Sequence, residues 1–587
     1  MKCVSINPRA AAAVSLAAVV LLATGPASAA GWWSLDWPYR RSVTIDSAER
    51  TGLPGDDIAV VDMPTGGALA AGGKDIRVLT AGKDERACRV LMVGPGDRIK
   101  VAFAVQPGVK QYYVYFGRKD PPARKADLDV RRGVLLEMWK YPGGGAGDLE
   151  QIKKTLFGRS KHLVAAGFRD RIFLGHNPFG PHNRVASVFT AYLKCPADGR
   201  YQFVSSSQNA SFLLVDDELV VDNGGWHRAQ RDIRMSGNVM LKKGLHKLTM
   251  YHVTGRGYPI IVAAWRPPGA KKVKVIPPEV FAPVTRAKLG EMRRFGENLG
   301  ADFLYEHAGE AFLADRYHQR FVFRGRAIGR LGRNAKWQWD FEDGQTASGE
   351  RAEHVYLVDG MYTVKLTVTS GLGTFERVNR VWVSRPWDRV TENKIDSERT
   401  YSDIVAAYDL AALSPEAAAE AVLLFSRTGN FDAIRRTGDA FVAGKDLPPA
   451  AAELLMPIYA DALIRKDRTR EAVDALETVA GRAEKSPATA ALLLAEAGRL
   501  ALEELSDGDR ALKLYERAIQ SFGHLASGVG VRAARIGIGD VQRLRGDYDK
   551  AAKAYAEAGE RVEGRGLKPA VARGSYVRYL EDFMRRR

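Results

Sequence analysis

The sequence has few cysteines and lacks the compact motifs that mark common enzymes. Its 587 residues include three cysteines, too few for a disulfide framework. It has no His-Glu-x-x-His or Cys-x-x-Cys pattern, which excludes the common zinc spacings, and no P-loop or Gly-x-Ser-x-Gly elbow. Paired carboxylates for glycoside hydrolysis stay open, because they are defined by folded distance.

The first thirty residues are predicted to be a secretory signal peptide. Lys2 and Arg9 form a basic front, residues 10–23 are almost continuously apolar, and residues 27–29 are small, as at a cleavage site. The apolar run is shorter than the about 20 residues that span a bilayer. We therefore expect residues 1–29 to be removed, with no membrane span in the mature chain and a periplasmic, cell-surface or secreted location.

The net charge indicates a class of partner without identifying one, and the two cysteines outside the signal peptide leave the disulfide state open. Lys plus Arg total 87 and Asp plus Glu total 69, a net charge of +18. Such an excess suits anionic glycans or envelope surfaces, and export together with the dispersal of the basic residues argues against nucleic acid. Whether Cys88 and Cys195 pair is left open, as is the oligomeric state.

The composition changes three times along the chain and so divides it into four modules. Short β-like runs separated by Gly, Pro and Asp fill residues 31–118, 131–268 and 303–386, and an apolar helical periodicity fills residues 400–587. The predicted fold class is multidomain and mainly β: three β-sandwich or barrel modules followed by an α-helical solenoid. A charged stretch, residues 286–298, is expected to form a helix between the second and third modules.

The first module contains three runs of an identifiable kind: Trp37-Pro-Tyr-Arg-Arg41, Gly73-Lys-Asp-Ile-Arg-Val78 and Tyr113-Val-Tyr-Phe-Gly117. Their succession resembles a β-sandwich module of unknown function found at the front of exported bacterial multidomain proteins. The tryptophans at 32, 33 and 37 would either stack on a sugar or close one end of the core. The core role is the favoured interpretation.

The second module carries a more specific succession. It opens with Gly133-Val-Leu-Leu-Glu-Met-Trp139 and continues with the run at 189–193, Pro196-Ala-Asp-Gly-Arg-Tyr-Gln-Phe203 and the run at 212–223. It ends with Lys243-Gly-Leu-His-Lys-Leu248 and the run at 260–265. This order resembles the PA14 module, a β-barrel-like sandwich of bacterial toxins, glycosidases and adhesins. The resemblance implies a glycan-binding module.

The resemblance also locates candidate ligand-binding residues. Adhesin PA14 modules hold calcium through adjacent aspartates, and here that pair aligns with Gln208-Asn209. Calcium takes six to eight oxygens with several carboxylates among them, so neutral amides argue against it and no cofactor is expected. The Asp216-Asp217 pair falls one strand later, at a turn. The candidates are Gln208, Asn209, Asp216, Asp217, Asp222, Asn223, Trp226 and His227, with local turn chemistry as the alternative for the acidic and Asn positions and sugar stacking as the role of the loop aromatic.

The third module contains Trp337-Gln-Trp-Asp-Phe-Glu-Asp-Gly344 and His354-Val-Tyr356, with Tyr362 beyond. This run resembles the PKD domain, an immunoglobulin-like sandwich, with Glu342 where glycine is usual. The resemblance implies a spacer or ligand-presenting unit without catalytic activity. It also assigns the acidic cluster at 340–343 to a turn.

The helical region repeats with a period near 40 residues. Ala433, Ala472, Ala511 and Ala551 are spaced 39, 39 and 40 residues apart, which indicates stacked helix pairs. The pattern resembles tetratricopeptide repeats, whose usual period is about 34 residues, and implies that residues 400–587 bind another envelope protein. A rigid spacer is the alternative, and residues 569–587 are expected to cap the stack.

These features together predict an exported, non-catalytic envelope or extracellular protein. Its β modules would bind glycan or cell-surface polysaccharide, and its helical repeats would bind a protein. No stretch of catalytic-domain size is left unassigned, which favours binding over catalysis. Two alternatives remain: an accessory or catalytic component of polysaccharide hydrolysis, and a purely structural scaffold.

Overall fold

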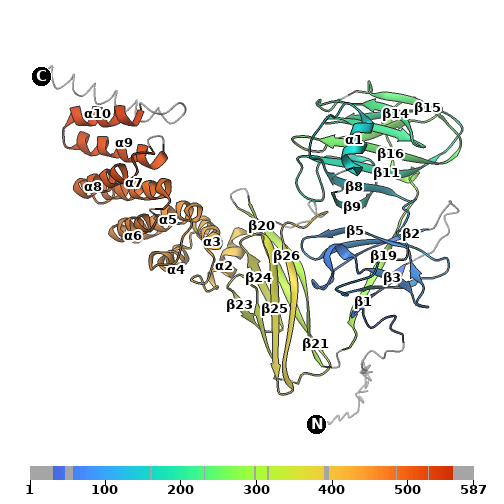
Figure 1. Cartoon of the computed structure of the whole chain (residues 1–587), viewed down its shortest axis with the longest axis horizontal. Helices are drawn as coiled ribbons and strands as arrows, with labels where there is room; N and C mark the ends of the chain where they lie inside the picture. The colour runs from blue at the N-terminus through green and yellow to red at the C-terminus, as the bar shows by residue number, and fades with distance from the viewer. Residues whose placement is uncertain are drawn as a thin grey trace, which may run out of the picture.

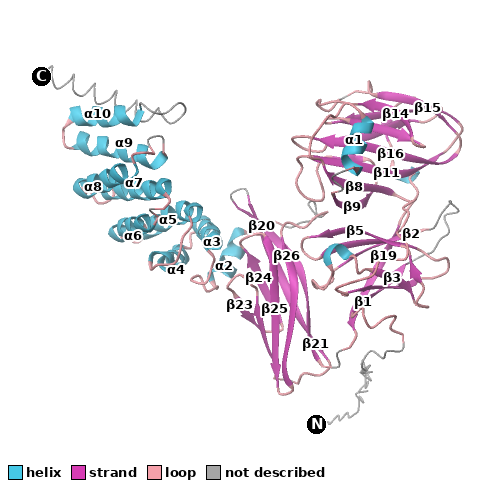
Figure 2. Cartoon of the chain, in the orientation of Figure 1, coloured by secondary structure: helices cyan, strands magenta, loops and turns pink. Residues whose placement is uncertain are grey.

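The computed structural model shows a β-rich part followed by an array of helices (Figures 1 and 2). It describes residues 31–45, 57–158, 162–230, 232–296, 299–313, 316–332, 334–388, 395–483, 485–525 and 528–559. The predicted signal peptide and the predicted capping helix at 569–587 lie outside the described residues. The mainly β fold class followed by helices is confirmed.

The first module is completed by a strand from much later in the chain. Its strands are β1 (Tyr39–Ile45), β2 (Ile58–Met63), β3 (Arg77–Thr80), β4 (Glu85–Arg86), β5 (Cys88–Gly94), β6 (Arg98–Ala104), β7 (Gln111–Phe116) and β19 (Thr285–Arg294). They form one eight-stranded sheet in the order β4-β3-β7-β1-β19-β2-β6-β5. Because β19 pairs with β1 along its length and with β2 at Thr285 and Arg286, it joins the two halves of the sheet. The second module is therefore inserted into the first.

The expected helix at 286–298 is wrong, because residues 285–294 are strand β19. Ala287, Leu289 and Met292 pack against the core of the first module, while the charged residues between them are mostly exposed. A register shift in the pairing with β1 breaks the two-residue alternation. Because this segment has many charged residues and an interrupted two-residue alternation, its sequence does not show the usual pattern of a strand.

The second module is a sandwich of two sheets. Its elements are β8 (Val134–Lys140), α1 (Leu149–Phe157), β9 (Leu163–Arg169), β10 (Phe173–Leu174), β11 (Val185–Cys195), β12 (Gly199–Ser207), β13 (Ser211–Val215), β14 (Glu218–Asn223), β15 (Ser236–Leu241), β16 (Gly244–Thr254), β17 (Ile261–Arg266) and β18 (Lys274–Val275). One sheet has the order β14-β13-β16-β11-β8-β9, and the other β10-β17-β12-β15 with β18 beside β17. Their inner faces enclose an apolar core. Helix α1 packs on the outer face of the larger sheet through Leu149, Ile152 and Leu156.

Cys88 and Cys195 do not form a disulfide, because they lie in the cores of different modules. Cys88 and Cys195 are free and buried. Cys88 lies in the core of the first module and Cys195 in that of the second. Burial raises the pKa of each thiol to about 11, so both behave as small core residues.

The third module packs a three-stranded sheet against a four-stranded one. The sheets are β20-β21-β24, comprising Gly300–Leu313, Arg316–Ile328 and Arg351–Tyr356, and β23-β22-β25-β26, comprising Thr346–Ser348, Lys336–Asp340, Gly360–Ser370 and Gly373–Val383. Trp339 is buried between them. The acidic cluster shapes a turn: Asp340 accepts from the Glu342 N–H, and Asp343 from the Gln345 N–H.

The helical region stacks its helices in pairs. They are α2 (Glu398–Ala406), α3 (Pro415–Thr428), α4 (Phe431–Val442), α5 (Pro449–Ile464), α6 (Thr469–Arg482), α7 (Pro487–Glu503), α8 (Gly508–Phe522), α9 (Val529–Leu544) and α10 (Tyr548–Gly559). Helices α3, α5, α7 and α9 pack on one another in series, and each packs on the even-numbered helix that follows it. The four repeating alanines are fully buried near the start of α4, α6, α8 and α10. None of the helices in the described ranges is long and apolar enough to cross a membrane.

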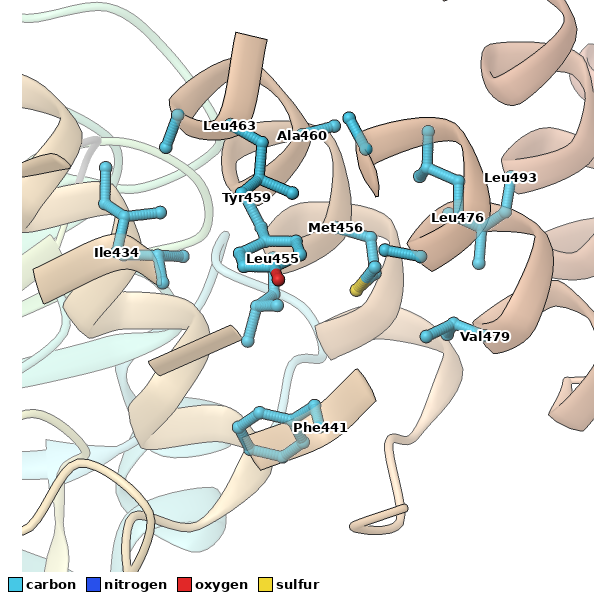
Figure 3. Close-up of a cluster of buried hydrophobic side chains, with 14 of the residues drawn as sticks. Ile434, Phe441, Leu455, Met456, Tyr459, Ala460, Leu463, Leu476, Val479 and Leu493 are labelled. Atoms are coloured by element: carbon cyan, nitrogen blue, oxygen red, sulfur yellow. The ribbon is translucent and has the colours of Figure 1, made fainter. Parts of the chain in front are cut away.

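Apolar side chains fill the space between neighbouring pairs. Figure 3 shows Leu455, Met456 and Tyr459 of α5 lying between Phe441 of α4 and Leu476 of α6. The Tyr459 ring packs so closely on Gly438 that a Cβ there would lie 2.1 Å from the ring. Its hydroxyl donates to Asp439 at 2.7 Å.

A short segment after β26 joins the three β modules. The Trp387 ring lies 5.2 Å from Trp382 of the third module and also packs on Gly94 of the first module and Gly180 of the second. Asp388 pairs with Lys100 of the first module and, at 2.6 Å, with Arg169 of the second. Burial opposes ionisation of this carboxyl, yet the two cations hold its pKa below the ordinary value.

The helices continue directly from the third module. Leu313 and Val355 of its sheet share one apolar cluster with Tyr401 and Val405 of α2. Arg320 reinforces the contact by pairing with Asp396 at 2.8 Å. The third module and the helical array therefore share one packed apolar cluster.

A buried carboxyl supports the contact between the first and third modules. Asp97 accepts from the Thr65 and Gly66 N–H groups at 2.6 Å and from the Thr65 hydroxyl at 2.7 Å, and the Gly96 N–H donates to Trp382 at 3.1 Å. Burial raises the pKa of the Asp97 carboxyl to about 6, against these hydrogen bonds.

The strand assignment of β19 predicts the effect of core truncation. Met292→Ala should lower the free energy of unfolding by about 2–3 kcal/mol, because it removes a side chain buried in the first module. Arg286→Ala, on the exposed face, should change it by less than about 0.5 kcal/mol. Urea unfolding followed by tryptophan fluorescence measures both. Equal effects of the two variants would contradict the strand.

The raised pKa of Asp97 predicts a pH dependence of stability. The folded protein binds this proton more tightly than the unfolded chain, so the stabilising contribution is complete below about pH 3.8 and is lost as the pH rises through about 6. From pH 7 to pH 4 the natural chain should gain about 1–3 kcal/mol relative to Asp97→Asn. Asn keeps the acceptor for both N–H groups and does not titrate. Parallel stability curves for the two proteins would refute the assignment.

Candidate functional site

The candidate residues of the second module lie at two opposite ends of strand β13. Gln208 and Asn209 precede the strand, whereas Asp216 and Asp217 follow it. Strand β14 runs back antiparallel, so Asp222 and Asn223 return to the first end, and Trp226 and His227 continue from there. A five-residue strand spans about 16 Å. The structure brings six of the eight candidates together and leaves the Asp216-Asp217 pair apart.

Asp216 and Asp217 form the two-residue turn between β13 and β14. Both have positive φ, 48° and 68°, which Asp tolerates and which this class of hairpin requires. Asp216 accepts from the Lys247 N–H at 3.0 Å and contacts His246 Nδ1 at 2.6 Å. Asp217 pairs with the Lys247 ammonium at 2.8 Å. These contacts stabilise the hairpin turn, and His246 makes one of them.

At the other end, the turn at 208–209 is tied to the loop that follows β14. The Asn209 N–H donates to the His227 carbonyl at 2.8 Å, and Gln208 Oε1 accepts from the Ala229 N–H at 3.2 Å. His252 reaches the Gln208 carbonyl at 2.8 Å through Nε2. Burial lowers the pKa of His252 to about 4, so this histidine is neutral. It stabilises the turn at 208–209 from the interior of the domain.

A buried amide organises the loop itself. Asn223 is 2% exposed, and its Nδ2 donates to Ser207 Oγ at 3.1 Å and Ser211 Oγ at 3.3 Å. Gln230 Nε2 donates to Asn223 Oδ1 at 3.0 Å and lies 3.1 Å from His227 Nδ1. A continuous hydrogen-bond network thus runs from the interior to the loop surface and fixes residues 223–230.

The donor set at this end does not fit calcium. The Gln208 side-chain oxygen and the Asn209 carbonyl already accept protein hydrogen bonds. Asp222 is the only carboxylate among the six candidates gathered there, and its Oδ1 accepts from the Gly224 N–H at 3.0 Å. Within the described ranges, no three His, Cys, Asp or Glu side chains form a group that could hold a metal ion. Calcium needs several carboxylates, so this end is organised by amides instead.

Two exposed aromatic side chains stand above this network. Trp226 is 51% exposed, and its ring packs so closely on Gly255 that a Cβ there would lie 3.0 Å away. Tyr258, three residues further on, is 58% exposed, with its ring 4.6 Å from that of His182. The two aromatics therefore stand on adjoining loops. Sequence reasoning missed Tyr258, whose signal is the glycine-rich run Gly255-Arg-Gly-Tyr-Pro259.

The tryptophans of the first module do not form a comparable surface. Trp32 and Trp37 are each 3% exposed. Trp32 Nε1 donates to the Trp37 carbonyl at 3.0 Å, and Trp37 Nε1 to the Asp75 carbonyl at 2.6 Å. Both rings close the core, which is the role favoured from the sequence.

Because the ligand atoms at this end of the second module do not fit calcium, we expect calcium to leave the stability of the protein unchanged. Neither 5 mM CaCl₂ nor excess EDTA should shift the thermal unfolding midpoint of the natural chain by more than about 1 °C, since a ligand that does not bind the folded state cannot stabilise it. Asn223→Ala should lower the midpoint under both conditions alike, because it leaves buried partners unsatisfied. A calcium-dependent rise of several degrees would contradict the amide-organised site.

Comparison with known proteins identifies two of the four modules. Family models match a PA14 domain at residues 176–278 and a PKD domain at residues 318–383. No curated protein matches the chain.

Similar solved structures include three of different kinds. The PA14 sugar-binding domain from an RTX adhesin is 16% identical, with 26% of this chain and 99% of that chain covered and a TM-score of 0.23. The epithelial adhesin 9 A domain from Candida glabrata, in complex with Galβ1-3GlcNAc, is 11% identical, with coverage of 26% and 90% and a TM-score of 0.20. BtubC from P. vanneervenii is 19% identical, with coverage of 30% and 78% and a TM-score of 0.24. On the family matches, this chain contains a PA14 domain followed by a PKD domain, and a helical region follows them.

Proposed function

We propose that the protein is an exported, non-catalytic envelope or extracellular protein that binds glycan at the aromatic end of its PA14 domain. The observation that carries the proposal is the pair of exposed aromatics, Trp226 and Tyr258, on adjoining loops. Aromatic rings stack on the C–H face of a sugar, and an exposed apolar patch, here two aromatics on adjoining loops, marks a binding surface. The signal peptide predicted at residues 1–29 supports export to a periplasmic, cell-surface or secreted location.

The support beneath these rings suits a binding surface. The network from Asn223 through Gln230 to His227 holds the loop that carries Trp226, and Gly255 packs under the ring. A surface that is already ordered loses little conformational entropy when a ligand binds. The sugar would therefore meet a preorganised face.

The helical region is proposed to bind a second envelope protein. Its supporting features are the four buried alanines at a spacing of 39 to 40 residues and the serial packing of α3, α5, α7 and α9, which together resemble tetratricopeptide repeats. Arrays of this kind present extended surfaces to proteins. Affinity capture with the mature chain, natural and with exposed residues of α5 and α7 substituted, tests this part of the proposal.

A purely structural scaffold is the second candidate function. It is favoured by the shared junction at Trp387 and Asp388, which fixes the three β modules to one another. A scaffold would capture its protein partner without any sugar and would bind no glycan. A role in polysaccharide hydrolysis, in contrast, would require turnover that is lost when one carboxylate is substituted.

Substitution of the aromatics tests glycan binding directly. Trp226→Ala and Tyr258→Ala should each weaken binding of the mature chain to its best ligand on a glycan array by about fivefold to thirtyfold, since loss of a ring contact of this kind costs about 1–2 kcal/mol. Phe157→Ala, at a half-exposed aromatic on α1, is the matched control and should leave affinity unchanged. Failure of the natural chain to bind any glycan would sink the proposal.

A further inference from the structure

Three arginines lie on the loops that carry the exposed aromatics of the PA14 domain or adjoin those loops. Arg184 ends the loop before β11, Arg228 follows Trp226 by two residues, and Arg256 lies between Gly255 and Tyr258. All three are exposed. They come from three loops that are distant in sequence and meet at this end of the sandwich.

Backbone hydrogen bonds hold these loops side by side. The Arg184 N–H donates to the Gly255 carbonyl at 2.9 Å, which places Arg184 next to Arg256. Asn183 Oδ1 accepts from the Gly257 N–H at 2.8 Å. Arg228 is held by the loop whose His227 carbonyl accepts from Asn209. Ordered backbone therefore holds the three arginines on the loops that carry Trp226 and Tyr258 or adjoin them.

Few carboxylates oppose the three arginines. Asp232 pairs with Arg234 at 2.8 Å. Asp222 keeps its charge at this end, since its Oδ1 accepts only from the Gly224 N–H. Among the residues that the structure describes, no carboxylate forms an ion pair with Arg184, Arg228 or Arg256. Three arginine charges against the one of Asp222 leave the aromatic surface with a local positive potential.

We infer that the glycan bound at this surface is acidic, with carboxylate or sulfate groups that pair with Arg184, Arg228 and Arg256 while its rings stack on Trp226 and Tyr258. The inference rests on the proposed function and names its ligand class. The planar guanidinium fork matches carboxylate and sulfate oxygens in a bidentate manner. In this account the arginine side chains provide the positive charge at the site. This agrees with the finding that the oxygen ligands at this end do not fit a calcium ion.

The test compares matched charged and neutral polysaccharides on the mature chain. Oligogalacturonide is compared with its fully methyl-esterified form, and dextran sulfate with dextran, by titration calorimetry. At least one acidic member should bind at least about tenfold more tightly than its neutral partner, and raising NaCl from 0.1 to 0.5 M should remove most of that difference, because exposed charges are screened.

Arginine variants localise the effect. Arg184→Gln with Arg256→Gln, and separately Arg228→Gln, should weaken binding of the acidic ligand by about tenfold or more with an unchanged unfolding midpoint. Arg200→Gln is the matched control, since Arg200 is exposed at the opposite end of β12 from Gln208. It should stay within about twofold of the natural chain.

The possible negative results distinguish failure of the acidic-ligand inference from failure of the proposed function. Equal binding of charged and neutral partners, or loss of binding in Trp226→Ala without any effect of the arginine variants, would overturn the inference and leave the proposed function standing. Binding to vesicles containing phosphatidylglycerol but to no acidic polysaccharide would also overturn it. If no glycan of either charge binds, the proposed function falls as well.

Discussion

The arrangement of the whole chain depends on the ion pairs of Asp388. This carboxylate lies just after the last strand of the PKD domain and pairs with Lys100 of the first module and Arg169 of the PA14 domain. Its neighbour Trp387 packs on all three modules. Charges held in such partly buried positions are costly to leave unpaired, so the junction has one strongly preferred geometry. The PA14 domain is thereby fixed relative to the PKD domain, which in turn shares its interior with α2.

Strand β19 adds a second constraint. Because it joins the halves of the first sheet only after the chain has passed through the PA14 domain, that domain is attached to the first module at both of its ends. The two also meet through an apolar cluster containing Leu91, Leu135 and Ala166. Two covalent connections and a packed interface restrict hinge motion far more than one linker would. Figure 1 shows the result, with the PA14 domain and the helical array on opposite sides of the PKD domain.

The sequence predicted what depends on local pattern. The turn run at 337–344, the PA14 succession and the alanine period each reflect contacts within one module, and their expected fold class is confirmed. It did not predict β19, because the partner strand β1 lies about 250 residues earlier and pairing at that distance leaves no local signal. The sequence did place Asp216-Asp217 at a turn one strand after Gln208-Asn209. It could not join Tyr258 to Trp226, since Gly255 brings those loops together only in the folded domain.

The central claim is that the proposed glycan-binding end of the PA14 domain and the helical array are held at a fixed separation. Its most direct test is the distance distribution between spin labels at Lys154→Cys on α1 and Arg399→Cys on α2, measured by pulsed electron paramagnetic resonance. Both positions are exposed, whereas Cys88 and Cys195 are buried and should escape labelling. The account predicts one narrow distribution that broadens when Asp388→Ala removes the junction. A broad distribution in the protein with Asp388 intact would contradict it.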